Sequence, residues 1–253
     1  MIGPSVLLQV GLRDSTEQWF HTNDSTYQID IAGELVLDLE NPYGYDYATT
    51  GLERFYTRDG SVSQKVLDEE VALDHFAYFP GSPLTGAVWR LMPRPLDDYR
   101  IFIALTTVAL LGAALLFRGP LAWRLAAGTA LAANPVAVRS AWFGQNDAPA
   151  ILAVVLAFAL ATRERFAWAG AALAAGVLLK QFAVVAVPFF FVLLLVLGAE
   201  RRAIRNAALT FVGVPPPASC RSSSPTRKHS STTRSCTGRR PTGSSATASR
   251  RCS

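Results

Sequence analysis

Long apolar runs separated by short turns that carry arginine fill the second half of the chain. A bilayer core about 30 Å thick takes roughly 20 mostly apolar residues per helix, and shorter runs can span beside neighbouring helices. So many apolar runs interrupted mainly by basic turns are hard to bury in the helical core of a water-soluble protein, which is the alternative interpretation. We therefore predict an all-α fold, a polytopic transmembrane helix bundle over residues 101–214. Its helices are expected at residues 101–117, 121–138, 148–162, 166–179, 182–198 and 203–214.

The first hundred residues follow a different pattern. Residues 1–12 are apolar but too short to span a bilayer, and they lack the basic start of a signal peptide. We expect them to be part of a first transmembrane helix whose beginning is missing. Residues 13–100 are mostly polar and form the predicted outer loop segment. Within them, apolar residues recur at helical spacing over 26–39, which predicts an amphipathic helix with Asp24 or Ser25 as its N-cap.

Two further elements are expected in this loop segment. The sequence Asn41-Pro42-Tyr43-Gly44 is typical of a turn, because proline and glycine each favour backbone angles that end a helix. An acidic amphipathic helix is expected at about residues 62–73, before the aromatic sequence His75-Phe76-Ala77-Tyr78-Phe79. The segment is therefore expected to be helical and rich in both acids and aromatic rings.

Charge assigns the loops to opposite sides of the predicted bundle. Residues 13–100 carry sixteen Asp or Glu and seven Lys or Arg. Cytoplasmic loops favour Lys and Arg, so this segment is expected on the non-cytoplasmic face, together with residues 135–147 and the Lys180-Gln181 break. This arrangement requires residues 83–92 to lie at the interface; if they span, the downstream orientation inverts. The basic turns expected on the cytoplasmic side are Arg118/Arg124, Arg163/Arg165 and Arg201/Arg202/Arg205.

The composition changes abruptly at Pro215-Pro216-Pro217. Residues 215–253 are nearly all Ser, Thr, Arg, Pro, Gly and Ala, and they hold all three cysteines and eight basic residues with no acid. Without this tail the formal net charge falls from +5 to −3, so the basic balance gives no argument for nucleic-acid binding by the body of the chain. Such a composition stays disordered. Because it interrupts an apolar helix, we interpret it as the product of a reading-frame shift in GC-rich coding DNA, with a genuine basic tail as the alternative.

Ionisable groups among the apolar runs are the candidates for chemistry, since charge at membrane depth is costly and usually has a partner or a task. Arg139 is one candidate, although its long side chain can equally extend to an interface. Asp147 follows Gly144-Gln145-Asn146 and can equally cap the next helix. Lys180, with Gln181, separates two apolar runs that leave no room for an ordinary loop, which favours a functional role.

The order of several short motifs resembles one class of enzymes. The motifs are Asp24-x-x-Tyr27, Asn41-Pro42-Tyr43, Tyr78-x-Pro80, Asn134-Pro135, Gly144-Gln145-x-Asp147 and Lys180-Gln181 after an Ala/Leu-rich helix. In this order they resemble the GT-C-type integral membrane glycosyltransferases, most closely the polyprenyl-phosphate-mannose-type mannosyltransferases of bacteria and archaea. The likeness covers about residues 5–214 and rests on the order, since no single motif is specific. The chain departs from the family in its missing helix start, in the absence of helices after the tail begins, and in having no acid pair at residues 24–25.

The resemblance implies transfer of a sugar, mannose in the nearest relatives, from a polyprenyl-phosphate donor to an acceptor hydroxyl at the non-cytoplasmic face of the cell membrane. Asp24 would be the general base, with Asp30 in reserve, and such a carboxylate contributes on the order of 10²–10⁴-fold to the rate. Arg139 and Lys180 would hold the donor phosphate through charge-assisted hydrogen bonds. The resemblance implies no cofactor, with a divalent metal as the open alternative. The pocket is expected to include Tyr27, Tyr43, Gln145, Asp147 and Gln181.

Other functions remain as alternatives at this point. A transporter or flippase-like membrane protein also places charged groups and broken helices at the membrane midplane. The long acidic and aromatic segment after the first helix favours the transferase. The chain is also interpretable as a truncated, inactive fragment that does not complete its bundle. There is no glycine-rich phosphate loop, and three scattered histidines do not make a zinc site. The expected partners are membrane lipids and the lipid-linked sugar, not nucleic acid.

Overall fold

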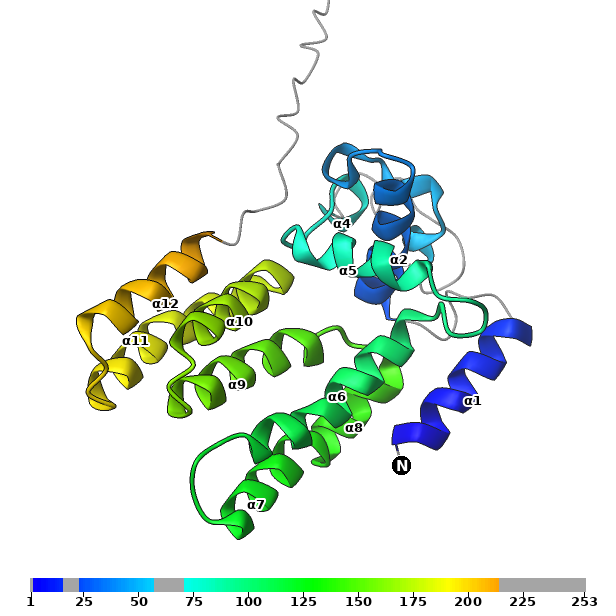
Figure 1. Ribbon diagram of the computed structural model, residues 1–253. Helices are drawn as coiled ribbons and strands as arrows, with labels where there is room; N and C mark the ends of the chain where they lie inside the picture. The colour runs from blue at the N-terminus through cyan, green and yellow to red at the C-terminus, as the bar shows by residue number, and fades with distance from the viewer. Residues whose placement is uncertain (1, 16–22, 57–70, 214–253) are drawn as a thin grey trace, which may run out of the picture. The chain divides into compact units, whose positions relative to one another are not determined.

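The computed structural model describes residues 2–15, 23–56 and 71–213, and every regular element in this part of the chain is helical (Figure 1). The fold is therefore all-α, as predicted. The described residues belong to one compact unit, residues 1–220. The acidic helix predicted at residues 62–73 is described only from residue 71 onward, as α4 (Val71–Asp74). The predictions for the tail, residues 215–253, lie outside the described residues.

The polar segment folds around α2 (Asp24–Leu37), which starts two residues before the predicted boundary. Its N-cap is Asn23, not Asp24 or Ser25: the Asn23 side chain accepts a hydrogen bond from the Ser25 backbone N–H at 3.0 Å. The predicted turn at Asn41 is confirmed, because its side chain accepts from the Tyr43 backbone N–H and starts a short helix. The 3₁₀ helices that follow α2 are η2 (Pro42–Gly44), η3 (Tyr47–Thr49) and η4 (Leu52–Tyr56).

A pair of glycines lets α2 pack closely against α5 (Gly81–Arg90). A Cβ atom added to Gly33 would lie 2.6 Å from the backbone carbon of Gly86, and one added to Gly86 would lie 2.7 Å from the carbonyl oxygen of Ile29. The two backbones therefore touch without intervening side chains. The core beside this contact contains the buried side chains of Ile29, Leu35, Tyr47, Leu52, Leu73, Phe76, Tyr99 and Ile103.

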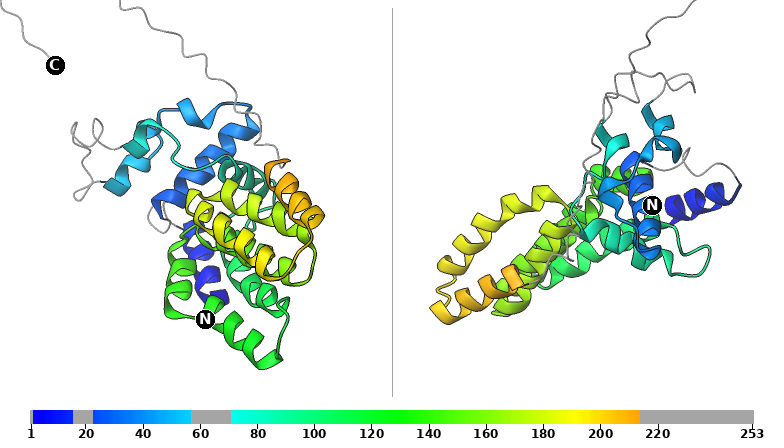
Figure 2. Two further views of the ribbon diagram at one scale, coloured as in Figure 1. Left: turned by 90° about the vertical axis from the view of Figure 1, so that its left-hand side faces the viewer. Right: turned by 90° about the horizontal axis from the view of Figure 1, so that it is seen from above.

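The apolar runs form a set of packed helices (Figures 1 and 2). The most extensive packing is of α9 and α12 on α10, and of α7 and α9 on α6. A second core, with Ala157, Leu173, Phe190 and Leu194 among its members, lies between α9, α10 and α11. The bounds are α1 (Ile2–Ser15), α6 (Tyr99–Leu115), α7 (Leu121–Ala132), α8 (Pro135–Phe143), α9 (Ala148–Thr162), α10 (Phe166–Leu179), η5 (Gln181–Val185), α11 (Ala186–Val196) and α12 (Arg201–Gly213).

Two of the predicted runs are not single helices. The run 121–138 breaks after Ala132, because Asn134 caps a new helix by accepting from the Ala137 backbone N–H, with Pro135 at its first position. The run 182–198 starts as the 3₁₀ helix η5 before α11. Within the described residues, no helix combines the length and the apolar character that crossing a membrane requires.

The turns between these helices gather at two separate places. Arg118, after α6, pairs with Glu164, after α9, at 2.8 Å, and the Arg163 Nε donates to the Leu116 carbonyl at 2.5 Å. Two of the arginine turns that the sequence assigns to one side therefore do lie together. At the other ends of α9 and α10, Lys180 contacts the turn that precedes α9, and the Ser82 hydroxyl of α5 donates to the Leu179 carbonyl at 2.5 Å.

The close contact of α2 and α5 predicts opposite effects of alanine at two helical glycines. We expect Gly33→Ala to lower the free energy of unfolding by about 1–3 kcal/mol, since the new methyl group must push two backbones apart. Gly112→Ala in α6 is the matched control, because nothing lies within 4 Å of the added Cβ. It should raise stability by about 0.5–1 kcal/mol. Unfolding of the purified variants followed by circular dichroism measures both, and equal effects would contradict the packing.

Candidate functional site

Polar side chains from distant segments meet at the start of α2. The Lys180 ammonium donates to the side-chain oxygen of Asn146 at 2.6 Å and to the Asp147 carboxylate at 2.5 Å. The Ser25 Oγ lies 3.5 Å from the same Asn146 oxygen. Next to it, the Thr26 hydroxyl donates to the Gly144 carbonyl. We call the group formed by Asp24, Ser25, Tyr78, Asn146, Asp147 and Lys180 the lysine cluster.

The backbone around Lys180 explains how its side chain reaches this position. α10 ends at Leu179, and Lys180 is extended, with φ −153° and ψ 133°, before η5 begins. The apolar runs on both sides thus stop at a single extended residue, as the sequence indicates. The Lys180 side chain is only 17% exposed, so its charge is largely removed from water and needs polar partners. Asn146 and Asp147 provide them.

The turn that carries these partners is fixed from several directions. Gly144 has a left-handed φ of 69° at the end of α8, and a Cβ atom there would lie 3.0 Å from the Cγ of Arg100. Arg100 is itself buried and pairs with Asp98 at 2.6 Å. Asp147 precedes α9, but within the described residues its side chain makes no capping hydrogen bond. Its carboxylate, 42% exposed, binds Lys180 instead.

Asp24 is the carboxylate at the first position of α2. Its Oδ1 accepts from the Ser25 backbone N–H at 2.7 Å, and its Oδ2 accepts from the Tyr56 hydroxyl at 3.1 Å. The side chain is half-buried, and each oxygen keeps a lone pair beyond these bonds. A carboxylate held in this way has a fixed direction and can still accept a proton from a ligand.

Tyr78 connects Asp24 to Lys180. The Lys180 ammonium lies 5.3 Å from the centroid of the Tyr78 ring, within the range of a cation–π contact. Burial raises the pKa of the Tyr78 hydroxyl above its ordinary value, and the charges of Asp24 and Asp147 add to this, while a hydrogen bond with the Ser25 side chain opposes it. Tyr78 therefore interacts with Lys180 through its ring and with Ser25, Asp24 and Asp147 through its hydroxyl group.

Aromatic rings extend from this tyrosine. Tyr43 and Tyr78 both contact Phe76 edge-on, with ring centroids 5.6 Å and 5.5 Å from it. The Tyr43 hydroxyl donates to the Tyr78 carbonyl at 3.0 Å, and burial raises its pKa to about 12. Of the predicted pocket residues, Tyr43 is thus joined to the lysine cluster through Tyr78.

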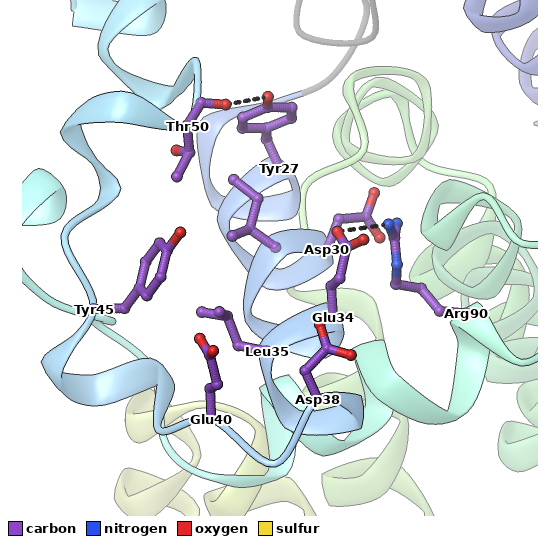
Figure 3. A pocket seen from close by; sticks show the side chains of 10 residues that line it. Tyr27, Asp30, Glu34, Leu35, Asp38, Glu40, Tyr45, Thr50 and Arg90 are labelled. Carbon is purple, nitrogen blue, oxygen red and sulfur yellow. Dashed lines mark hydrogen bonds and ion pairs between the residues drawn. The ribbon is translucent and has the colours of Figure 1, made fainter.

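Asp30 and Tyr27 lie elsewhere, along a pocket of about 400 Å³ on the flank of α2 (Figure 3). Asp30 is buried, and the Tyr27 hydroxyl donates to the Thr50 carbonyl at 2.8 Å. Arg90 pairs with Glu34 at 2.9 Å. The pocket is lined by one arginine, Arg90, and by four acidic side chains: Asp30, Glu34, Asp38 and Glu40. Asp24 is not part of this lining, so the two candidate bases face different places.

The remaining predicted residues do not join the lysine cluster within the described part of the chain. Arg139 is exposed on α8, with its guanidinium 5.6 Å from the centroid of the Phe143 ring. The Gln145 side chain accepts from the Ser140 hydroxyl at 2.8 Å. Gln181 is exposed at the start of η5. The sequence analysis missed Asn146 as a partner of Lys180 and Ser25 as a neighbour of Asn146, although Asn146 is the variable position of the motif Gly144-Gln145-x-Asp147.

Within the residues that the structure describes, no three His, Cys, Asp or Glu side chains are grouped so that they could hold a metal ion. The lysine cluster itself contains one cation, two carboxylates, an amide and hydroxyl groups. These can bind an anion at one point and accept a proton at another.

The comparison with protein families identifies the class of enzyme. A sequence model of glycosyltransferase family 87 matches residues 76–215, which is more than half of the chain. The chain belongs to glycosyltransferase family 87. It is thus a glycosyltransferase and uses a sugar donor. No curated protein and no solved structure matches the chain significantly. The part that matches family 87 includes Tyr78, Asn146, Asp147 and Lys180, whereas Asp24 precedes it.

Ionisation of Tyr43 predicts a loss of stability in alkali. Below about pH 10 the residue is neutral in the folded and the unfolded chain. Between pH 10 and about pH 12 the unfolded chain loses the proton and the folded chain keeps it, so stability falls as pH rises. We expect Tyr43→Phe to flatten this decline in unfolding measured across pH 8–12, although it removes the bond to Tyr78. Parallel declines for both proteins would contradict the assignment.

Proposed function

We propose that this family 87 member is a multi-pass membrane glycosyltransferase of the GT-C type and that the lysine cluster is its transfer site. It would move a sugar, in the first instance mannose, from a polyprenyl-phosphate donor to an acceptor hydroxyl at the non-cytoplasmic face. The observation that carries the proposal is the grouping of a fixed carboxylate, Asp24, with a poorly solvated cation, Lys180. The next residue after Asp24, Ser25, lies 3.5 Å from the same Asn146 oxygen that accepts from Lys180. Transfer from a phosphate needs one group of each kind.

Lys180 is the group that we assign to the donor phosphate. An ammonium has three N–H donors, and Asn146 and Asp147 occupy two of them. Phosphate oxygens would take the third and replace Asp147, whose carboxylate is exposed enough to be solvated once released. The pocket beside α2 is unsuitable for the same task, since four carboxylates against one arginine repel an anion.

Asp24 is the group that we assign to the acceptor. As the acceptor oxygen forms its bond to the sugar C1, the bond between C1 and the phosphate oxygen breaks, and the phosphate leaves with the electron pair. The acceptor proton goes to the Asp24 carboxylate, which the Ser25 N–H and the Tyr56 hydroxyl hold in place. The Lys180 charge stabilises the phosphate as it leaves. Tyr43 is 40% exposed, so part of its ring is available to stack against a sugar face.

The membrane setting is supported by the surface of the helices. Large apolar side chains are exposed on most of them, and lipid is the solvent in which such a surface is stable. The helices α9 and α10 consist almost wholly of apolar residues and have no polar face. A polyprenyl chain is apolar as well and would lie against this surface. Exposed examples are Leu105, Trp123, Val136, Trp168, Val196 and Val212.

Replacement of Asp24 tests the base. We expect Asp24→Asn to lower the rate of sugar transfer from a radiolabelled polyprenyl-phosphate-mannose donor by on the order of 10²–10⁴-fold, because the amide does not accept the proton. Asp46→Asn is the control: Asp46 is exposed and caps η3 through its side chain, which asparagine does equally well. Transfer by Asp24→Asn at the rate of the control would remove Asp24 from the mechanism.

Replacement of Lys180 tests the phosphate contact separately from turnover. We expect Lys180→Met to weaken equilibrium binding of the donor by about 10–100-fold, since a hydrogen bond to a charged group contributes about 1.5–3 kcal/mol. Arg139→Gln, the second phosphate contact that the resemblance implies, should have a much smaller effect, because Arg139 stacks on Phe143 outside the cluster. If Arg139→Gln weakened binding and Lys180→Met did not, the donor site would lie along α8.

A further inference from the structure

Exposed arginines gather at the ends of the helices that point away from the lysine cluster. The turns at residues 118, 163–165 and 200–205 contain six arginines and two glutamates. Arg118 pairs with Glu164 and Arg163 bonds to the Leu116 carbonyl. Four further arginines are exposed here, and the structure gives them no ion pair within the described residues. We call these four, Arg165, Arg201, Arg202 and Arg205, the arginine patch.

The three arginine-containing turns, at residues 118, 163–165 and 200–205, are neighbours in space. One cavity of about 390 Å³ is lined by residues from all three, including Arg118, Glu164, Phe166, Gly198 and Glu200. α12 packs along α10, where the Thr210 hydroxyl donates to the Ala167 carbonyl at 2.8 Å, so the start of α10 lies beside α12. The positive charges therefore belong to one surface and not to isolated loops.

The exposed face of α12 changes character along its length. Arg201, Arg202 and Arg205 are exposed in its first turns, and Leu209 and Val212 are exposed further along the same face. The rise of about 1.5 Å per residue separates Arg205 from Val212 by roughly 10 Å. Cations at one level and aliphatic side chains below them match the headgroup and hydrocarbon layers of a bilayer leaflet.

Two exposed tryptophans lie in the first turns of helices that begin at this end. Trp123 and Trp168 are each the third residue of a helix that begins at this end, α7 and α10, and they are 75% and 70% exposed. Tryptophan concentrates at the interface of lipid and water, where the ring is apolar and its N–H still finds a partner. Each lies beside an arginine: Arg124 follows Trp123, and Arg165 precedes Trp168.

We propose that the arginine patch, with Trp123 and Trp168, binds the headgroups of anionic phospholipids. The occupant follows from the charge and from the apolar surface directly below it, since a soluble anionic partner would leave Leu209 and Val212 in water. The proposal rests on the proposed function only for its membrane setting. It does not involve the lysine cluster, so anionic lipid is bound at a place where no sugar is transferred.

The test is a competition between two lipids for the purified 253-residue chain. The protein is equilibrated in mixed micelles with equimolar phosphatidylglycerol and phosphatidylcholine, and the lipid that stays bound is measured by mass spectrometry. Each arginine near an anionic surface favours binding by about fivefold. We expect the wild type to retain phosphatidylglycerol preferentially, Arg205→Gln to lower that preference by about fivefold, and the fourfold glutamine variant of the patch to lower it by at least about tenfold.

Controls separate the patch from charge in general and from folding. Arg94→Gln removes an arginine that is 86% exposed outside the patch, and it should keep the wild-type preference. Increasing salt should weaken the preference of the wild type itself, which tests the electrostatic term without any substitution. Asp24→Asn should lower transfer, as described above, and keep the lipid preference, so that failure of the transfer site and failure of the lipid site are seen separately.

The proposal is overturned by any of three results. The first is equal retention of the two lipids by the wild type. The second is an unchanged preference in the fourfold variant. The third is release of phosphatidylglycerol by inorganic phosphate at equal concentration, which would make the patch a site for free phosphate.

Discussion

The partly buried ammonium of Lys180 is the constraint on which the candidate site depends. A cation that is mostly out of water needs oxygen ligands close by, and here they come from one turn 33 and 34 residues earlier in the chain. The same turn is bound to α2 through Thr26 and Gly144. One charge thus relates three segments, the end of α10, the start of α9 and the start of α2. Asp24 takes its place near Tyr78 because α2 begins there.

This arrangement gives the ion pair of Lys180 and Asp147 two roles. In the absence of donor, the ion pair provides the Lys180 ammonium with a hydrogen-bond acceptor of opposite charge. When an anion binds, the unequal exposure of the two side chains decides which of them is displaced. An unpaired Lys180 would carry a large desolvation cost because its side chain is mostly buried, whereas the more exposed Asp147 carboxylate is hydrated once it is released. The amide oxygen of Asn146 carries no charge to repel a phosphate and can hold the lysine during the exchange. The ligand therefore replaces one partner while the other keeps the ammonium in position.

Local sequence signals predicted the positions of several helices, but they did not predict which residues of different helices contact one another. The helix at residues 148–162 was predicted with its observed ends, because charged residues bound its apolar run on both sides. The cap of α2 was misplaced, since Asn23, Asp24 and Ser25 all carry suitable oxygens and only the geometry selects one. Asn134-Pro135 was noticed as a motif but not as the break between α7 and α8.

The break at Lys180 was visible in the apolar pattern; its partner Asn146 was not, because no local pattern pairs residues so far apart. Asp24 and Asp30 are six residues apart on a helix, so at 3.6 residues per turn they point to different sides, as the structure shows.

The use of a lysine in the candidate site, and of exposed arginines at the opposite ends of the helices, also has a chemical reason. A guanidinium binds phosphate with two parallel hydrogen bonds and holds it tightly, whereas an ammonium acts as a single charge with rotatable donors. A site that must release its phosphate product after each transfer is better served by one lysine that has a competing carboxylate. An additional guanidinium facing the donor would retain the product and also attract other anions; Arg100, which packs against Gly144 of the same turn, is buried and pairs with Asp98. At the opposite end, where we propose that lipid headgroups are held and not turned over, the same tight binding is an advantage, and there the arginines are found.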